Sequence, residues 1–135
     1  MLGSSNYENF RYKGESANIL EVIQNANVVV LPSFHEGFPR ILIEAFACGR
    51  SVVTTTAPGC DEAVEDGFNG LKVPVGDSSS LALAIVRLLK NDDLRKQIGQ
   101  RARLHGVKHF DTSVIVGAHV ELFKTLIWLR VPSGE

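Results

Sequence analysis

Apolar residues follow two patterns that alternate along the chain. Unbroken β-branched runs such as Val28–Leu31 and Ser51–Thr55 are typical of strands buried on both faces of a parallel sheet. Between these runs, apolar residues recur at three- and four-residue spacing, which predicts helices with one buried face. Alternating strands and helices predict an α/β fold with a parallel sheet. The strands are expected at Phe10–Lys13, Val28–Leu31, Ser51–Thr55 and Leu71–Val73, and the helices at Asn18–Asn25, from near Pro39 to Gly49, at Asp61–Glu65, at Ser78–Lys90, from Asp92 to about His105, and from Thr112 to about Leu129.

The stretch from Val28 to Gly49 is where we expect the chemistry of this chain. Pro32 ends the strand, Gly37 can supply unusual backbone angles in the turn, and Pro39 suits the first position of the following helix. The unpaired amides and the positive end of the dipole at a helix start attract anions. This strand, turn and helix therefore predict a site for phosphate.

Two carboxylates accompany this predicted anion site. Glu36 lies in the turn, and Glu44 follows one to two turns into the helix. Both can face the crevice beyond the carboxyl end of the strand, where open α/β sheets bind ligands. Carboxylates beside a phosphate site are suited to hydrogen bonding with sugar hydroxyls.

Composition narrows the class of protein. The chain has 135 residues, 44% of them hydrophobic and 21% charged, with a formal charge of −1. These values predict one soluble globular domain, with no sign of a nucleic-acid or membrane-surface partner. Cys48 and Cys60 have neither metal-ligand nor redox spacing, which favours a reducing, intracellular location. We find no signal-peptide pattern and no apolar run near the roughly 20 residues that cross a bilayer.

Five ordered motifs between Ala26 and Leu89 resemble a known family. They match the C-terminal, donor-binding half of the family-four retaining glycosyltransferases, which have the two-domain GT-B architecture with Rossmann-like domains. The matching elements are Leu31-Pro32-Ser33, Glu36-Gly37-Phe38-Pro39 followed by Glu44-Ala45 with seven residues between the two glutamates, Gly49 before a valine-rich strand, Pro58-Gly59-Cys60-x-Glu62, and Asp66-Gly67-x-Asn69-Gly70 before Val73-Pro74.

The resemblance implies a function for several residues. The family transfers a sugar from a nucleotide-diphosphate sugar, here expected to be a UDP-sugar, with retention of configuration and without a metal or other cofactor. The acceptor would be a glycan or a lipid-linked molecule in polysaccharide or glycoconjugate biosynthesis. Glu36 would be catalytic and contact the donor sugar together with Gly37, Phe38 and Pro39, while Glu44 would bind the ribose and Gly14 and Glu15 would lie near the base.

The chain also departs from the family pattern. The basic pair that grips the diphosphate lies upstream of anything present here, and Arg11 and Lys13 do not match its positions. We therefore expect residues 1–135 to form a partial domain that lacks its first strands, is inactive alone, and carries a terminal helix, 112–129, that packs on an absent N-terminal domain. The resemblance implies a cytoplasmic enzyme, at the inner face of the membrane. It is compatible with peripheral membrane association of the whole enzyme and with homodimerisation of this chain.

Simpler roles remain open for the polar residues. Glu44 can pair with Arg40 at i, i+4 on a helix surface, and Glu36 can be a solvated loop carboxylate. Glu62 can assist the donor site or stabilise the start of a helix. His35 is expected at the surface, and the remaining histidines lack a common ligand spacing; these are His105, His109 and His119.

A second functional class is a non-enzymatic α/β module, such as a receiver-like or mononucleotide-binding regulatory domain. A receiver needs an acidic cluster at a strand end, whereas these strands end in Pro32, Thr55 and Pro74. No Gly-x-Gly-x-x-Gly or Walker loop is present.

Topology generates two further expectations. If strands are missing beside Val28–Leu31, its edge should be covered by Phe10–Lys13 moved inward, by that segment of a second molecule, or by pairing of two copies. The inward movement is the favoured option. The last helix is too apolar for a solvated helix, so Phe123, Ile127 and Trp128 should be partly exposed or packed against another copy.

Overall fold

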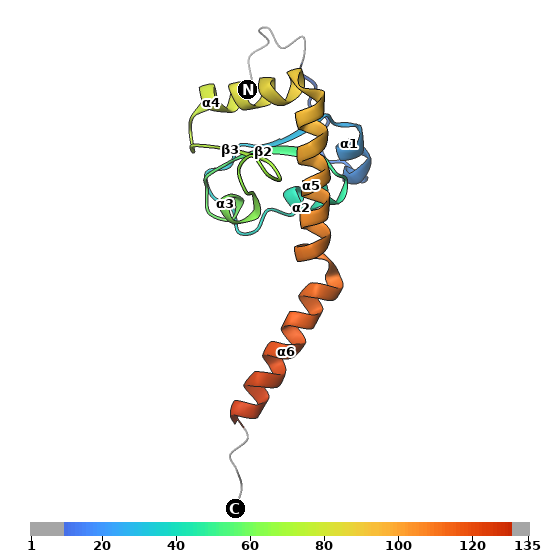
Figure 1. Cartoon of the computed structure of the whole chain (residues 1–135), viewed down its shortest axis with the longest axis vertical. Coiled ribbons are helices and arrows are strands. Elements are labelled where there is room, and N and C mark those ends of the chain that lie inside the picture. Colours follow the sequence, from blue (N-terminus) through green and yellow to red (C-terminus); the bar gives the residue numbers. More distant parts are fainter. Residues whose placement is uncertain (1–9, 131–135) are drawn as a thin grey trace, which may run out of the picture.

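The structure is a computed structural model that describes residues 10–130 of the chain. Strands and helices alternate through the first part of the chain, and three helices follow the last strand (Figure 1). The elements are α1 (Ile19–Asn25), β1 (Val28–Leu31), α2 (Arg40–Ala47), β2 (Ser51–Thr55), α3 (Cys60–Ala63), β3 (Leu71–Val73), α4 (Ser78–Lys90), α5 (Asp92–Phe110) and α6 (Thr112–Arg130).

The three strands form one parallel sheet in the order β1-β2-β3. Val28 pairs with Ser51 at one end of the β1–β2 ladder, and Thr55 pairs with Val73 at the end of the β2–β3 ladder. All five residues of β2 are buried, as expected for a central strand. The predicted α/β class and the strands β1, β2 and β3 are confirmed.

Helices cover both faces of the sheet (Figure 1). Phe46 of α2 and Cys60 of α3 pack with Val52 of β2 in one apolar cluster. Leu88 of α4 packs with Val53 in a second cluster on the opposite face, because successive side chains of a strand point to opposite sides. The sheet is therefore the middle layer, with α2 and α3 on one face and α4 on the other.

Helix α5 contributes to both clusters through different turns, Ala102 to the first and Ile98 to the second. It binds the sheet at the amino end of β2, where Ser51 Oγ donates a hydrogen bond of 2.5 Å to the carbonyl of Arg95. The helix approaches the chain so closely that a Cβ on Gly99 would lie 2.3 Å from the carbonyl oxygen of Gly49. Helix α5 thus packs at the amino end of β2. The carboxyl ends of the parallel strands lie at the opposite end of the sheet.

The prediction of a first strand at Phe10–Lys13 is wrong. These residues form no strand, and the side chains of Phe10 and Tyr12 are 63% and 87% exposed. The segment also does not move beside β1, which pairs only with β2 among residues 10–130. β-propensity reflects packing against neighbouring strands more than an intrinsic preference, so it could not place four residues by itself.

Smaller corrections concern the element ends and one turn. Pro39 is the residue before α2, with ψ of 107°, and not its first helical residue. Gly37 does not adopt a positive φ, whereas Gly49 after α2 and Gly59 in the loop after β2 do, with φ of 64° and 82°. Helix α5 continues past His105 to Phe110, whose ring packs against that of Phe38.

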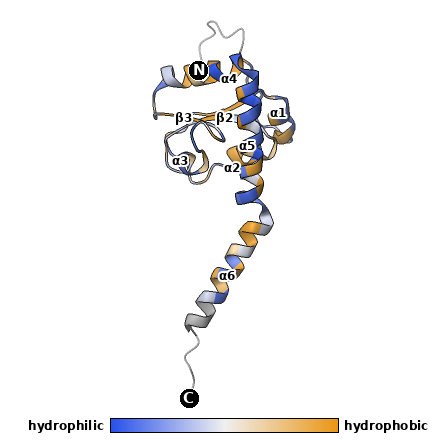
Figure 2. Cartoon of the chain, viewed as in Figure 1, coloured by the Kyte–Doolittle hydropathy of each residue, from blue (hydrophilic) through white to orange (hydrophobic). Residues whose placement is uncertain are grey.

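Helix α6 extends away from the rest of the molecule (Figure 1) and carries apolar residues on more than one side (Figure 2). The expected exposure of Phe123 is confirmed at 60%, whereas the side chains of Ile127 and Trp128 lie outside those that the structure describes. Within residues 10–130, no helix combines the length and the apolar character needed to cross a membrane.

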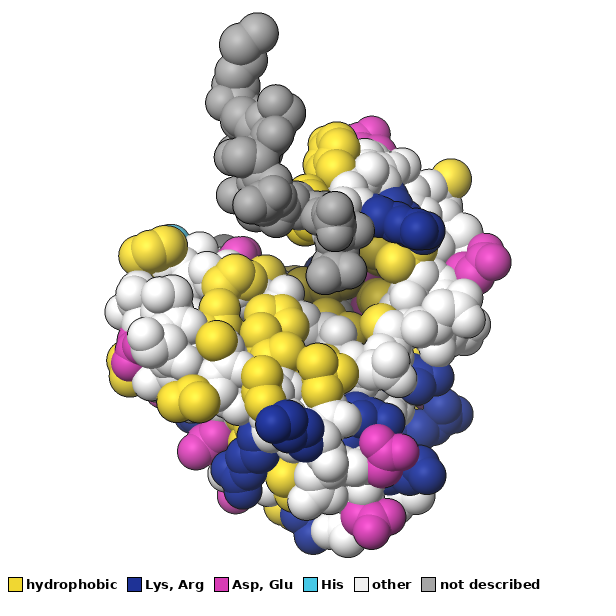
Figure 3. All heavy atoms as spheres, turned by 90° about the horizontal axis from the view of Figure 1, so that it is seen from above, with side chains coloured by type: hydrophobic (Ala, Val, Ile, Leu, Met, Phe, Trp, Pro, Cys, Tyr) yellow, Lys and Arg dark blue, Asp and Glu magenta, His cyan; other side chains and the backbone are white. Residues whose placement is uncertain are grey.

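Hydrophobic side chains also gather on the face seen from the α4 side (Figure 3). Helix α4 contributes Leu83, Val86 and Leu89, which are 71%, 43% and 48% exposed. The opposite side of the same helix supplies Leu88 to the core. Helix α4 is therefore apolar on its outer side as well as on its inner side.

The contact between Gly99 and Gly49 predicts a stability effect. Gly99→Ala should destabilise the fold by about 1–3 kcal/mol, since overpacking outweighs the gain of up to about 1 kcal/mol in helix propensity. Urea-induced unfolding followed by circular dichroism measures the change. Gly117→Ala is the control, because its Cβ would meet nothing within 4 Å. Equal stability of the two variants would contradict the packing argument.

The edge of β1 predicts self-association. The strand is uncharged, Val30 is 36% exposed, and among residues 10–130 no strand pairs with its outer edge. An edge of this kind can recruit a second copy. We expect dimers at high protein concentration and expect Val30→Lys to suppress them. Size-exclusion chromatography with light scattering over a concentration series measures this. A parent chain that stays monomeric throughout would refute the prediction.

Candidate functional site

The loop between β1 and α2 carries the first candidate carboxylate. Ser33 Oγ donates a hydrogen bond of 2.5 Å to Glu36 Oε1, and the Glu36 side chain is half-buried. The amide of Glu36 donates to the carbonyl of Pro58 at 3.3 Å. Glu36 is thus held by its own loop at the carboxylate and by the loop after β2 at the backbone.

The loop after β2 makes further contacts to the same segment. Thr55 Oγ1 donates a hydrogen bond of 2.5 Å to the carbonyl of Ser33. Gly59 approaches so closely that a Cβ there would lie 1.9 Å from the carbonyl oxygen of Gly37. Only a residue without a side chain fits this contact and the positive φ of Gly59.

Glu44 lies in the second turn of α2, and its side chain is 17% exposed. It pairs with Arg40, whose Nε lies 2.9 Å from Glu44 Oε1. The i, i+4 pair anticipated as the simpler role therefore exists, but Arg40 is 89% exposed. A pair with one solvated partner contributes a few tenths of a kcal/mol, so it leaves the carboxylate available to a ligand.

The start of α2 has no side-chain cap. Pro39 occupies the capping position and makes no side-chain hydrogen bond to the first turn. By contrast, Asp77 caps α4 by accepting hydrogen bonds from the amide and hydroxyl of Ser80, and these bonds lower the pKa of the Asp77 carboxyl. Among the first-turn amides of α2, that of Leu42 donates to the Pro39 carbonyl at 3.0 Å, and no side chain caps the amides before it. An anion at this helix start stays a prediction.

The predicted base-binding residues lie in the loop before α1. Gly14 has a φ of 64°, and Glu15 is exposed. Glu15, Lys13 and Ser16 line a depression of about 450 Å³ along α1. Neither Glu36 nor Glu44 lines it. Lys13, to which the sequence pattern assigned no role, belongs to this depression.

A separate pocket of about 190 Å³ lies at the carboxyl ends of the strands. Pro32, Thr55 and Pro74 reach it from the ends of β1, β2 and β3, and Leu81 closes it from α4. Neither Glu36 nor Glu44 lines this pocket, which is on the α4 side of the sheet. The sequence indicated the strand ends but not that they enclose this space, because the side of the sheet that α4 covers is set by the fold.

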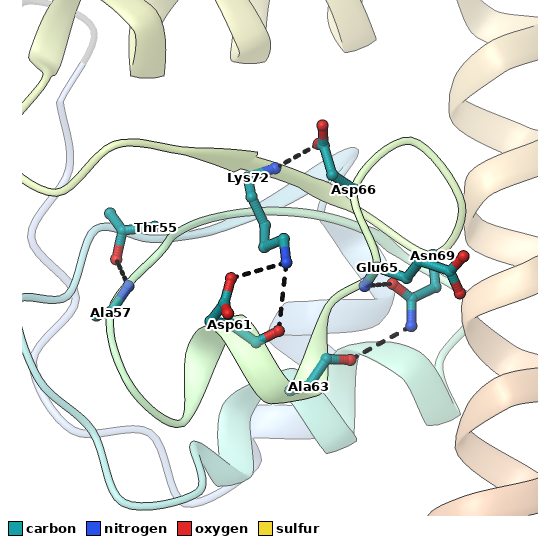
Figure 4. A network of polar contacts seen from close by, with 8 residues as sticks. All are labelled: Thr55, Ala57, Asp61, Ala63, Glu65, Asp66, Asn69 and Lys72. Carbon is teal, nitrogen blue, oxygen red and sulfur yellow. Dashed lines mark hydrogen bonds and ion pairs between the residues drawn. The ribbon is translucent and has the colours of Figure 1, made fainter.

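The turn after α3 has a structural role (Figure 4). The buried Asn69 accepts a hydrogen bond from the Glu65 amide at 2.8 Å and donates to the carbonyl of Ala63 at 3.3 Å. Lys72 forms a 2.8 Å ion pair with Asp61 of α3. The Asp66–Gly70 motif therefore holds α3 against β3, while Glu62 is exposed on the first turn of α3.

Aromatic side chains connect the candidate loop to the end of α5. The ring centroids of Phe38 and Phe110 are 5.1 Å apart, and those of His105 and Phe46 are 6.1 Å apart. Burial lowers the pKa of His105, as do the nearby charges of His109 and Lys108, while Glu65 opposes this shift. Within residues 10–130, no three His, Cys, Asp or Glu side chains lie close enough together to hold a metal ion.

The fold and the motifs on it define a class of protein, the glycosyltransferases of GT-B architecture, whose Rossmann-like sheet this chain shares. The sequence model of the family "Glycosyl transferases group 1" matches residues 4–105. The chain belongs to this family, and its likeness is to the C-terminal domain.

Curated relatives carry transferase names. The chain is 32% identical over 116 residues to the N,N'-diacetylbacillosaminyl-diphospho-undecaprenol alpha-1,3-N-acetylgalactosaminyltransferase of Campylobacter jejuni, covering 86% of this chain and 31% of that protein. It is 36% identical over 107 residues to the D-inositol 3-phosphate glycosyltransferase of Corynebacterium jeikeium, covering 79% and 26%. The chain thus spans less than a third of the relatives' lengths.

Solved structures agree with this assignment. HepE of Anabaena in complex with UDP matches with a TM-score of 0.79 and 29% identity, over 82% of this chain and 30% of HepE. A second structure of HepE contains UDP-glucose. These relatives favour the transferase class over the regulatory α/β module considered from the sequence.

The lowered pKa of His105 predicts a pH dependence of stability. The unfolded chain, with the ordinary pKa of 6.5, binds more protons than the folded chain as the pH falls. The contribution of His105 to the free energy of unfolding should therefore be fully present above pH 6.5 and be lost as the pH falls through the lowered pKa of the folded state. Urea unfolding at a series of pH values measures this. His105→Gln should flatten the dependence, whereas His119→Gln, on the exposed α6, should not.

Proposed function

We propose that this chain is the donor-binding part of a retaining glycosyltransferase that uses a nucleotide-diphosphate sugar, with UDP as the nucleotide. The single observation that carries the proposal is the Glu36 loop. It is fixed by bonds from Ser33 and to Pro58 and leads directly into the uncapped start of α2. A positioned carboxylate and a helix start without a side-chain cap thus lie within one loop and helix.

In this proposal each residue has a defined task. Glu36 accepts hydrogen bonds from donor-sugar hydroxyls near the reacting carbon and is the catalytic candidate. The loop at Gly37, Phe38 and Pro39 contacts the same sugar. Glu44 accepts bonds from the ribose hydroxyls. Gly14 and Glu15, beside the depression along α1, contact the base.

The transfer breaks the bond between the sugar and the diphosphate and forms a new bond from the same face of the sugar to the acceptor oxygen, and the proton of the acceptor hydroxyl passes to an oxygen of the leaving diphosphate. Negative charge develops on the leaving diphosphate as the sugar becomes oxocarbenium-like. The amides and the dipole at the start of α2 would stabilise that charge without a metal ion. Two features support this: the missing side-chain cap of α2 and the absence of a carboxylate from its first turn.

The relatives support the choice of substrate class. The names of the curated relatives describe sugar transfer to a lipid-linked diphosphate and to an inositol phosphate, and HepE has been solved with UDP and UDP-glucose. We propose a glycan or lipid-linked acceptor in polysaccharide or glycoconjugate biosynthesis. The whole enzyme would work in the cytoplasm at the inner face of the membrane, with acceptor contacts supplied by an N-terminal domain.

Binding without turnover is the expected behaviour of the chain alone. Without the basic grip on the diphosphate, the dissociation constant for UDP-glucose should be millimolar, which corresponds to about −4 kcal/mol. AMP should bind more weakly than UDP. Titration followed by NMR chemical shifts measures both constants. Sugar transfer by the isolated chain would contradict the expectation.

Substitution at Glu44 tests the ribose contact. Glu44→Ala should raise the dissociation constant for UDP about tenfold, because it removes a hydrogen bond to a charged group. Arg40→Gln breaks the ion pair but keeps Glu44, so it should bind UDP like the parent. Glu121→Ala, on α6, is a second control. Equal loss in Glu44→Ala and Arg40→Gln would show that the ion pair, and not ribose recognition, is what matters.

A further inference from the structure

The residues that hold Glu36 come from a different strand and loop. Thr55 is the last residue of β2, and Pro58 and Gly59 belong to the loop that follows it. Three separate contacts join them to the loop after β1. The Thr55 hydroxyl donates a hydrogen bond to the Ser33 carbonyl, the Glu36 amide donates one to the Pro58 carbonyl, and Gly59 packs closely against the backbone of Gly37. The two loops therefore form one unit.

Thr55 is the central residue of this unit. It is only 3% exposed, and its hydroxyl accepts a hydrogen bond from the Ala57 amide at 3.4 Å (Figure 4). The same hydroxyl donates to the Ser33 carbonyl at 2.5 Å. A hydroxyl can donate once and accept at the same time. The Thr55 side chain therefore fixes the loop after β1 and the loop after β2 with one oxygen.

Gly59 sets the distance between the two loops. A Cβ at this position would lie 1.9 Å from the Gly37 carbonyl oxygen and 2.7 Å from that of Glu36. Both atoms are backbone, so relief requires one of the two loops to move relative to the other. Any side chain at Gly59 would therefore change how the backbone around Glu36 sits against the loop after β2.

Ser33 transmits this placement to the carboxylate. Its carbonyl receives the bond from Thr55, and its hydroxyl donates to Glu36 Oε1 at 2.5 Å. One residue thus connects the end of β2 with the carboxylate. A serine at this position directs one Glu36 oxygen toward the loop, which leaves the other to the ligand.

From this geometry we propose that Thr55, Gly59 and Ser33 are positioning residues for Glu36, through which the end of β2 sets how the carboxylate meets the donor sugar. The inference rests on the proposed function of Glu36 as the sugar-binding carboxylate. None of the three residues needs to contact the donor. Their effect is expected on recognition of the sugar, and not on recognition of the nucleotide.

The first test reads the contact without a ligand. Amide resonances of Glu36 and Gly37 in ¹H–¹⁵N NMR spectra should shift strongly in Gly59→Ala. Gly67→Ala is the matched control, because Gly67 also has a positive φ, of 75°, but has nothing within 4 Å of its Cβ position. Unchanged Glu36 and Gly37 resonances in a folded Gly59→Ala variant would overturn the proposal.

The second test measures contact between the protein and the donor sugar. Saturation-transfer NMR with UDP-glucose compares signals from glucose protons with those from ribose protons. Thr55→Val, which keeps the shape of the side chain but lacks the hydroxyl, and Ser33→Ala should lose most of the glucose signal and keep the ribose signal. Thr55→Ser restores the hydroxyl and should restore the glucose signal.

Failure of the proposed function and failure of the positioning role would appear in different spectra. Absence of UDP-glucose binding by the parent chain would refute the proposed function, whereas the resonance shifts in Gly59→Ala would still decide whether Glu36 is positioned from β2. A parallel loss of glucose and ribose signals in Thr55→Val would show general destabilisation and overturn the positioning role. If Gly59→Ala does not fold, the pair Thr55→Val and Thr55→Ser decides alone.

Discussion

The complete burial of β2 is the constraint on which the rest of this structure depends. A buried strand must pair its backbone on both sides, which β1 and β3 provide, and its polar side chains must also find partners. Ser51, Thr54 and Thr55 donate to carbonyls of α5, of β1 and of the loop after β1. These bonds fix α5 at one end of the strand and the candidate site at the other.

The same constraint explains why glycines occur where they do. Close approach at the two ends of β2 leaves no room for a Cβ at Gly99, where α5 meets the segment before the strand, or at Gly59, where the two loops meet. Gly70 is similarly confined, with a Cβ position 2.6 Å from Val52. Backbone packing at Gly59 and the hydrogen bond from the Thr55 hydroxyl thus act together on the placement of the Glu36 loop.

Polar residues of the family motifs divide into two groups in the structure. Asp66 and Asn69 spend their hydrogen bonds on the turn between α3 and β3, so their role is to hold the fold together. Glu36 and Glu44 each use one carboxylate oxygen, Oε1, in their bonds to Ser33 and Arg40. The first group thus has a structural role, and the second is the one for which we propose a ligand.

The sequence by itself determined the α/β class, the three strands, the order of the helices and the candidate loop, because buried β-branched runs, helical periodicity and turn residues are local signals. Tertiary structure decided what those signals do not contain. The segment Phe10–Lys13 has strand propensity but lies outside the sheet, because strand pairing is a property of neighbours. The positive φ lies at Gly59 and not at Gly37, and Thr55 bonds to Ser33 across 22 positions of sequence, because both depend on how two loops from different strands meet in space.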